Sequence, residues 1–316
     1  MLFYPAMAYA NFDIKSFMHM PKQMDSNLSF DYSNASVDGD YIEGTTKTRD
    51  RELSADSVSF NYLFGLFDDL TLVFNFDKQT NILKDTYPND STGLVLTHEN
   101  KGFTDLKLGV KARIKDGSSG TTIMDILFNF SPGIFTKEEG VPKSTSSAGT
   151  GDGKPGNVSN GGHVFEGGVQ FGKPMKGNWE WQAKLFYTLR LKADEVDLTD
   201  ATVDKINSYG SYLISIKAQK YMARNESSLW SELGFEQTSS YKSRDTSSGN
   251  LTQFATATEY YFRFGARTSL LWPSLFGGIY GGVTKIDDVE GKSSGVPVVI
   301  KSDLGKTVGV EFKITI

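Results

Sequence analysis

The chain has 316 residues, of which 38% are hydrophobic, 13% aromatic and 22% charged, and its mean hydropathy is −0.33. With 33 basic residues against 38 acidic ones and a pI near 5.4, the composition offers no basic surface for nucleic acid. No apolar run reaches the length of about 18 residues that a membrane-spanning helix needs, and the absence of cysteine excludes disulfides and thiolate chemistry.

The N-terminus, MLFYPAMAYA, resembles the end of a secretory signal. Its apolar run closes on Ala8-Tyr9-Ala10, the small-x-small pattern of a cleavage site. We therefore expect residues 1–10 to be a signal-peptide remnant, 11–25 a periplasmic N-terminal segment and 26–316 the body of the protein. An ordinary apolar N-terminus is the alternative, and for 11–25 both a periplasmic tail and a small plug remain open.

Most of the remaining chain alternates apolar and polar residues with a period of two. In LTLVFNFDKQT (70–80), every second residue from Leu70 to Phe76 is apolar. Most such segments exceed the roughly 5–6 residues of a strand in a soluble protein and match the roughly 9–11 residues of a tilted strand that crosses a bilayer. The pattern predicts these strands: 26–36, 53–64, 70–80, 103–115, 121–135, 163–173, 179–193, 209–222, 228–243, 256–270, 275–287 and 304–316.

Short connections alternate with long polar ones along the chain. The long ones are 37–52, 81–102, 136–162, 194–208, 244–255 and 288–303. A transmembrane barrel shows this alternation because its periplasmic turns are tight and its extracellular loops are free to grow. We predict an all-β fold, a closed antiparallel transmembrane β-barrel of about 12 strands with short periplasmic turns and long extracellular loops. A soluble β-sandwich is the architectural alternative.

The tryptophans lie close to the short turns. Amphipathic indoles favour the headgroup level of a bilayer, where they form a girdle. We expect an aromatic girdle made of Trp179, Trp181, Trp230 and Trp272.

Taking the less apolar face of each strand as the inner one assigns the lumen. The residues predicted to line it or its constriction are Asp77, Lys107, Lys111, Arg113, Asp125, Glu180, Lys184, Arg190, Lys217, Glu232, Glu236, Glu259, Arg263, Arg267 and Glu311. Both signs of charge are present, often on adjacent strands. Such rows can pair and hold the wall rigid, or they can form a charged constriction for solutes, and the two roles can coexist.

The longest connection, 137–162, is rich in Gly and Ser. This composition favours a flexible surface loop, and an inward-folded constriction is the alternative.

Catalytic and metal sites have little support in the sequence. The histidines are His19, His98 and His163. A lipase-like site needs a nucleophile activated by His, and the sequence after His163, Val-Phe-Glu, lacks the Ser that barrel phospholipases place there. Scattered histidines without cysteines give no metal-ligand spacing. We expect no catalytic residue, no metal and no cofactor.

The segment KGFTDLKLGVKARIKDG (101–117) resembles a stretch of the outer-membrane barrels of the phenol meta-pathway transport family. The matching positions are Gly102, Asp105, Leu106, Leu108, Gly109, Lys111 and Arg113. The resemblance covers about one hairpin and implies a passive uptake route for small hydrophobic or aromatic molecules. The mixed charges predicted for the lumen favour polar solutes instead, so the two indications differ on the cargo.

The C-terminal stretch VGVEFKITI resembles the closing strand of outer-membrane barrels, although it ends in Ile316 rather than an aromatic residue. We predict a channel in the bacterial outer membrane for passive diffusion of small solutes. A non-conducting barrel that displays loops for adhesion or recognition is the alternative, and an outer-membrane lipid hydrolase is third. The expected partners are outer-membrane lipid, a small-molecule solute and the barrel-assembly machinery, with no nucleic acid.

Overall fold

The computed structural model describes residues 18–116, 122–146, 149–150, 153–159, 161–198, 202–222, 227–245, 251–270 and 275–315. Every regular element in these ranges is a β-strand, and none of these residues forms a helix long and apolar enough to span a membrane. The predicted signal-peptide remnant 1–10 and Trp272 lie outside the described residues.

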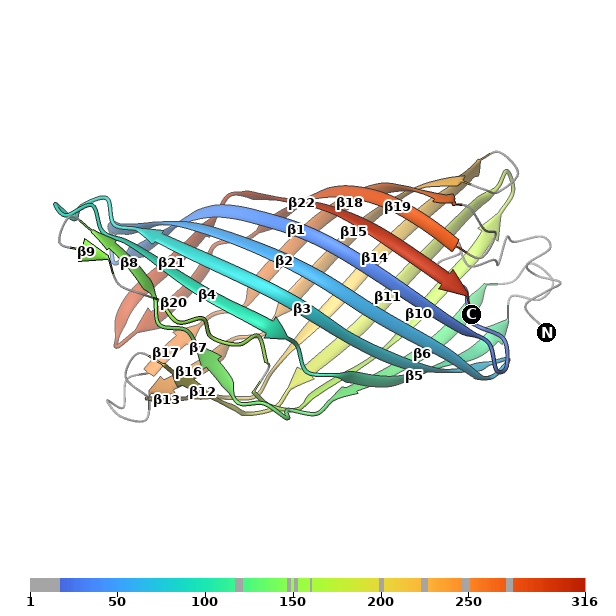
Figure 1. The fold of residues 1–316 in the computed structure, drawn as a ribbon, viewed down its shortest axis with the longest axis horizontal. Coiled ribbons are helices and arrows are strands. Elements are labelled where there is room, and N and C mark those ends of the chain that lie inside the picture. The colour runs from blue at the N-terminus through green and yellow to red at the C-terminus, as the bar shows by residue number, and fades with distance from the viewer. Residues whose placement is uncertain are drawn as a thin grey trace.

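Twelve antiparallel strands form the wall of a closed barrel (Figure 1), which confirms the predicted fold. In the order in which they neighbour each other around the wall, they are β1 (Ser26–Glu43), β2 (Thr46–Phe67), β3 (Leu70–Thr86), β5 (Lys107–Asp116), β6 (Ile123–Ser131), β10 (Val164–Met175), β11 (Trp179–Arg190), β14 (Tyr209–Met222), β15 (Ser227–Thr238), β18 (Ala257–Ser269), β19 (Leu275–Ile286) and β22 (Leu304–Thr315).

The last strand of the wall pairs with the first. β22 runs antiparallel to β1 from Asn27 opposite Thr315 to Ser36 opposite Lys306, with Phe30 opposite Phe312 between them. An open edge would leave backbone N–H and C=O groups without partners in hydrocarbon, where each costs several kcal/mol. Closure removes that cost.

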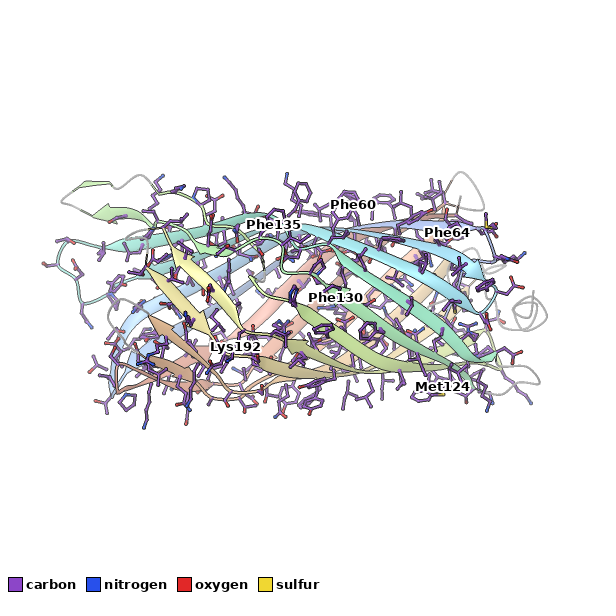
Figure 2. All side chains as sticks on the ribbon, turned by 90° about the horizontal axis from the view of Figure 1, so that it is seen from below. Phe60, Phe64, Met124, Phe130, Phe135 and Lys192 are labelled. Carbon is purple, nitrogen blue, oxygen red and sulfur yellow. The ribbon has the colours of Figure 1, made fainter. Side chains whose placement is uncertain are left out.

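Alternation along each strand separates an apolar outside from a polar inside. On β3, Leu72, Phe74 and Phe76 face outward, as the period of two predicts, while Thr71 is fully buried. The outer surface carries many exposed large apolar side chains, such as Leu233 at 63% exposure, and side chains project from the wall along its whole length (Figure 2). A surface of this kind is stable only against acyl chains, so the barrel spans a membrane.

Aromatic rings form a continuous band on the outer face of neighbouring strands. Phe60 on β2 stacks on Phe76 of β3 with ring centroids 4.9 Å apart. Phe60 and Phe30 of β1 pack edge to face, with ring centroids 5.2 Å apart. Phe312 of β22 extends the band at 6.5 Å from Phe30. Such cross-strand pairs stabilise the register across the seam where the first and last strands meet.

The predicted long loops are largely strands. The ten shorter strands are β4 (Val95–Phe103), β7 (Lys137–Glu139), β8 (Lys143–Ser146), β9 (Gly149–Thr150), β12 (Ala193–Asp197), β13 (Val203–Ile206), β16 (Tyr241–Asp245), β17 (Leu251–Phe254), β20 (Val289–Ser293) and β21 (Val296–Ser302). They gather at the end of the barrel opposite the end where β22 finishes (Figure 1). Since short turns mark the periplasmic end, these strands lie at the extracellular end.

The connection 37–52, predicted as a loop, is a β-hairpin. β1 and β2 pair from Ser26 opposite Phe64 up to Glu43 opposite Thr46, which leaves a two-residue turn whose Gly44 has a positive φ of 59°. Both faces of these strands contact water above the membrane, so their sequence is polar throughout and lacks the alternation of apolar and polar residues that predicts a strand.

The extracellular strands continue the wall as a second ring. β4 pairs with β3, β21 pairs with β1, and between them β7, β12, β13, β16, β17 and β20 pair in turn. The segment 153–157 fills the gap between β4 and β7. Gly156 pairs with β4 through Glu99 and Lys101, and the amide of Asn157 donates to Glu138 of β7. Part of the connection 137–162, predicted as a surface loop, therefore belongs to the barrel wall.

A charge on the outer face tests the membrane placement. Leu233 lies midway along β15, and Leu229 lies on the same face near the periplasmic end. We expect Leu233→Arg to lower the free energy of unfolding in phospholipid vesicles by about 2–4 kcal/mol and Leu229→Arg by about 0–1 kcal/mol. Urea titration of both variants measures the difference. Equal effects would contradict the placement of Leu233 at mid-bilayer.

Candidate functional site

The residues predicted to line the lumen all lie on the inner face of the wall. Lys107, Lys184 and Arg190 line an inner cavity together with Asp77 and Glu236. Glu259 and Arg263 line a second inner cavity, and Glu180 is fully buried, with its carboxylate 2.6 Å from the hydroxyl of Tyr221. The remaining residues form the ion pairs described next. Their role in selecting solutes stays a prediction.

The densest charge cluster joins β5, β6 and β10. Asp125 on β6 is fully buried, and Arg113 of β5 donates two hydrogen bonds to its carboxylate, at 2.6 and 3.0 Å. Lys111 lies 3.2 Å from Asp125, and the side-chain amide of Gln170 donates to it at 2.9 Å. A buried carboxylate is stable when its oxygens are this fully paired. The cluster occupies the lumen as part of a packed polar core.

A second set of ion pairs surrounds Trp230. Lys217 of β14 pairs with Glu232 of β15 at 3.2 Å, and Arg267 of β18 pairs with Glu311 of β22 at 2.5 Å. The Lys217 ammonium lies 4.2 Å from the centroid of the Trp230 ring and the Arg267 guanidinium 5.5 Å from it. Cations over an indole face are attracted by its quadrupole, so the ring links both pairs.

Trp230 was predicted in the outer girdle, and that prediction is wrong. Its side chain is 6% exposed and lies on the inner face, the same face as Glu232. Space for the indole comes from Gly265 opposite, where a Cβ would lie 2.7 Å from the ring. Trp179 and Trp181 do stand on the outer face beside a short turn, and Lys220 lies 5.0 Å from the Trp179 ring centroid.

Charged residues that stand opposite each other on neighbouring strands do not always form ion pairs. The register sets Glu232 opposite Arg263, but Glu236 stands opposite Glu259. Arg263 lies over the ring of Tyr261 at 4.6 Å, and Glu232 takes Lys217 as its partner. A charged residue of the lumen can therefore pair with a residue on the strand before it or on the strand after it around the barrel, and the register of the strands decides which partner is within reach.

The N-terminal segment enters the periplasmic end of the lumen. Met18 and Met20 are buried, and the Met18 carbonyl accepts a hydrogen bond of 2.6 Å from Arg113. The Met18 sulfur lies 3.2 Å from the amide nitrogen of Gln182 and packs on Gly172, where a Cβ would lie 2.7 Å from it. Of the two alternatives for residues 11–25, the described part, from Met18 onward, fits a plug rather than a free tail.

Besides the cavity lined by Glu259 and Arg263, two adjoining cavities occupy the extracellular half of the lumen. The larger, of about 460 Å³, lies between β3, β5, β10, β11, β14 and β15, and a neighbouring one of about 300 Å³ shares Val158, Val164 and Arg190 with it. Ser159 is buried beside them, its hydroxyl oxygen 2.9 Å from Asp105 and 2.8 Å from the carbonyl of Phe135. Residues 157–159 thus line the lumen as well as bordering the wall.

His163, the remaining catalytic candidate, is held by the main chain. Its Nδ1 accepts a hydrogen bond of 3.1 Å from the amide of Gly133, and its ring packs 5.7 Å from that of Phe130. Within the described residues no group of His, Asp and Glu is arranged to hold a metal ion.

Carboxylates crowd the extracellular rim. Burial raises the pKa of Glu139 on β7, and so do Glu195 and Asp197 on the neighbouring β12, while Lys137 opposes them. His98 lies 3.9 Å from Glu139, and its burial lowers the pKa of the imidazole. Both shifts favour the neutral form of the side chain concerned.

Searches of protein families and of curated proteins find no match to this sequence. Solved structures do match the fold. The COG4313 outer membrane channel from Pseudomonas putida F1 aligns with a TM-score of 0.55 at 12% identity, over 96% of this chain and 99% of that one. A FadL homologue from Pseudomonas aeruginosa aligns with a TM-score of 0.50 at 8% identity, over 92% and 90%.

A third match comes from a different functional class. The transport unit of the autotransporter AIDA-I from Escherichia coli aligns with a TM-score of 0.50 at 11% identity, over 98% of this chain and 96% of that one. These likenesses show the fold of bacterial outer-membrane barrels. Together with the apolar outer face, they locate the chain in that membrane. A shared fold does not by itself define a function.

Removing the carboxylate charge of Asp125 tests the paired core. Asp125→Asn leaves Lys111 and Arg113 buried without a counter-charge, so we expect the free energy of unfolding to fall by about 3–5 kcal/mol. Urea titration in vesicles measures it. Asp56→Asn is the matched control, because Asp56 accepts only exposed or half-buried hydrogen bonds from Tyr32 and Asn34. A loss no larger than the control's would contradict a tightly coupled cluster.

The rim should loosen as pH rises. Because the folded-state pKa of Glu139 is raised above the ordinary 4.5, its stabilising contribution is present below that value and is lost as pH rises through the folded pKa. We expect amide protection of β7 and β12, corrected for intrinsic exchange, to fall over that window. Glu139→Gln should keep its protection as pH rises through the folded-state pKa of Glu139, whereas Glu138→Gln, one residue away, should behave as wild type. Hydrogen exchange with mass spectrometry checks both.

Proposed function

We propose that this protein is an outer-membrane channel for passive diffusion of small solutes through a mixed-charge lumen. The observation that carries the proposal is the pair of adjoining polar cavities inside a closed barrel, which extend from the extracellular half of the lumen toward its charged middle. The COG4313 protein is an outer membrane channel, and the likeness of the two folds supports the same function for this chain.

Selectivity would come from the charged residues of the inner face. The set we propose comprises Lys107, Lys111, Arg113, Arg263 and Arg267 together with Asp125, Glu232, Glu236 and Glu259. Most of these positive groups are held by carboxylates, as in the Arg113–Asp125 and Arg267–Glu311 pairs. A solute therefore meets balanced charge and fixed dipoles rather than a field of one sign, which disfavours strong ion selectivity.

The segment around Met18 lies in the periplasmic end of the lumen, where its main chain and side chain contact Arg113 and Gln182. It is not a strand of the wall, so its withdrawal would leave the paired strands in place. We propose that movement of this segment controls passage.

Recognition of β22 by the barrel-assembly machinery is proposed from its outward-facing row, Val308, Val310 and Phe312.

Single-channel recording in planar bilayers tests the channel. We expect small conductance steps from the wild type and steps several-fold larger from a chain that begins at Pro21, because the buried residues Met18 and Met20 are then gone from the mouth. Met24→Ala is the control, since Met24 is 72% exposed outside the lumen. Equal steps from wild type and truncated chain would refute the role of the segment, and silence from both would refute the channel.

A non-conducting display barrel is the second candidate, favoured by the filled periplasmic half of the lumen and by the paired strands that rise above the membrane. Trimming the β20–β21 hairpin separates the two functions. Lost cell binding with unchanged solute flux would support display. Deletion of residues 140–160 is unsuitable, because Gly156 and Asn157 complete the wall.

A further inference from the structure

Residues from opposite walls of the barrel line the larger cavity. Asp77 of β3 and Glu236 of β15 both line it, and these strands lie six steps apart in either direction around the ring of twelve. Its volume of about 460 Å³ falls in the range of roughly 300–1,000 Å³ typical of small-molecule pockets. Side chains from several strands therefore surround a solute that passes through this cavity.

Some charges around this cavity form no direct ion pair with the described residues. Lys184 lies within electrostatic range of Glu232, and the Arg190 guanidinium lies 5.4 Å from the centroid of the Tyr209 ring. Lys107 pairs with Glu166 at 3.3 Å, as most lumen charges pair. In contrast, no ion pair joins Lys184, Arg190, Asp77 or Glu236 to any described residue. The Oδ1 atom of Asp77 is buried and accepts no hydrogen bond from the described residues, a state that is costly unless water or a ligand in the cavity supplies the donor.

The unpaired charges are separated by sign. The two cations, Lys184 and Arg190, both stand on β11, while the carboxylates come from β3 and β15. A ligand with one charge of either sign would leave the opposite set unmatched. A ligand that carries both charges on different atoms can match both sets.

Apolar side chains interrupt the polar inner face at this level. Phe186 of β11 and Leu213 of β14 stand opposite each other in register and both line the cavity, and Val164 and Val158 line it as well. On a wall whose inner positions are otherwise mostly polar, this surface offers a place for a hydrophobic group. In the register Phe186, Leu213 and Glu236 form one row across β11, β14 and β15, and Lys184 stands two residues from Phe186 along β11.

We infer that this cavity binds free amino acids with apolar or aromatic side chains as they pass through the lumen, an inference that rests on the proposed channel function. The carboxylate of the solute pairs with Lys184 or Arg190, its ammonium group with Glu236 or Asp77, and its side chain packs on Phe186 and Leu213.

Three probes of similar shape test the inference: L-phenylalanine, 3-phenylpropionate, which lacks the ammonium, and phenethylamine, which lacks the carboxylate. Binding is measured by calorimetry on the full chain in detergent. We expect L-phenylalanine to bind at least about tenfold more tightly than either analogue, because each analogue loses one set of charge-assisted contacts. Equal affinities for the three probes, or no binding of L-phenylalanine, would overturn the inference.

Variants assign the two sets of charges. Lys184→Gln with Arg190→Gln should weaken L-phenylalanine and 3-phenylpropionate about tenfold or more and leave phenethylamine unchanged. Glu236→Gln should weaken L-phenylalanine and phenethylamine and spare 3-phenylpropionate. Lys285→Gln, on the exposed outside of β19, is the matched control and should alter none. Heat-modifiable gel mobility verifies that each variant is folded, and loss of all three probes in a folded variant contradicts the assignment.

Flux in proteoliposomes separates this inference from the channel proposal. Preferential uptake of L-phenylalanine over both analogues supports the two together. Uptake of all probes at equal rates keeps the channel and refutes the site. Tight L-phenylalanine binding without flux of any probe keeps the site and refutes the channel.

Discussion

Backbone pairing in hydrocarbon is the constraint on which the rest of this structure depends. A strand in acyl chains cannot satisfy its N–H and C=O groups with water, so the sheet must close, as β22 does on β1. Closure with antiparallel neighbours fixes which residues face lipid and which face the lumen. The apolar outside and the charged inside are two consequences of one pairing rule.

The inner face behaves as a polar core. A ring of twelve strands is narrow, so charges on adjacent strands meet, and register decides which ones pair. Asp125 gathers Arg113, Lys111 and Gln170, and Trp230 lies between the Lys217–Glu232 and Arg267–Glu311 pairs. A cavity remains beside the Lys107–Glu166 pair, around Lys184, Arg190, Asp77 and Glu236, which form no ion pair with the described residues.

The sequence was most informative where one face meets lipid. The strand expected at 209–222 is β14 with the same bounds, because its apolar period is forced by the bilayer. The hairpin at 37–52 was missed because water on both faces erases that period. The nearness of Trp230 to a short turn indicates its height in the membrane but does not tell whether its side chain points outward or into the lumen. Trp230 stands two residues from Glu232 on the same strand, and this spacing places both side chains on the inner face.

Other features have no local signal. Met18 and Met20 are ordinary apolar residues in the sequence, and their burial follows from contacts with Arg113, Gln182 and Gly172, which lie far along the chain. The Gly- and Ser-rich stretch around Gly156 fits between β4 and β7 because a close backbone approach leaves no room for a Cβ, which would lie 2.3 Å from the carbonyl oxygen of Glu138. Such fits are set by tertiary structure.

The ring of paired strands above the membrane also has a consequence for the cell surface. Proteases and aggregating neighbours often recognise a target by adding a strand to an unpaired edge. Around the ring that continues the wall, the described strands pair with neighbours, from β21 against β1 to β7 against β12, while β9 pairs with β8 alone. Strand addition from outside would therefore have to begin at the edge of β9 or at the hairpin tips, and the rest of the rim offers it no free edge.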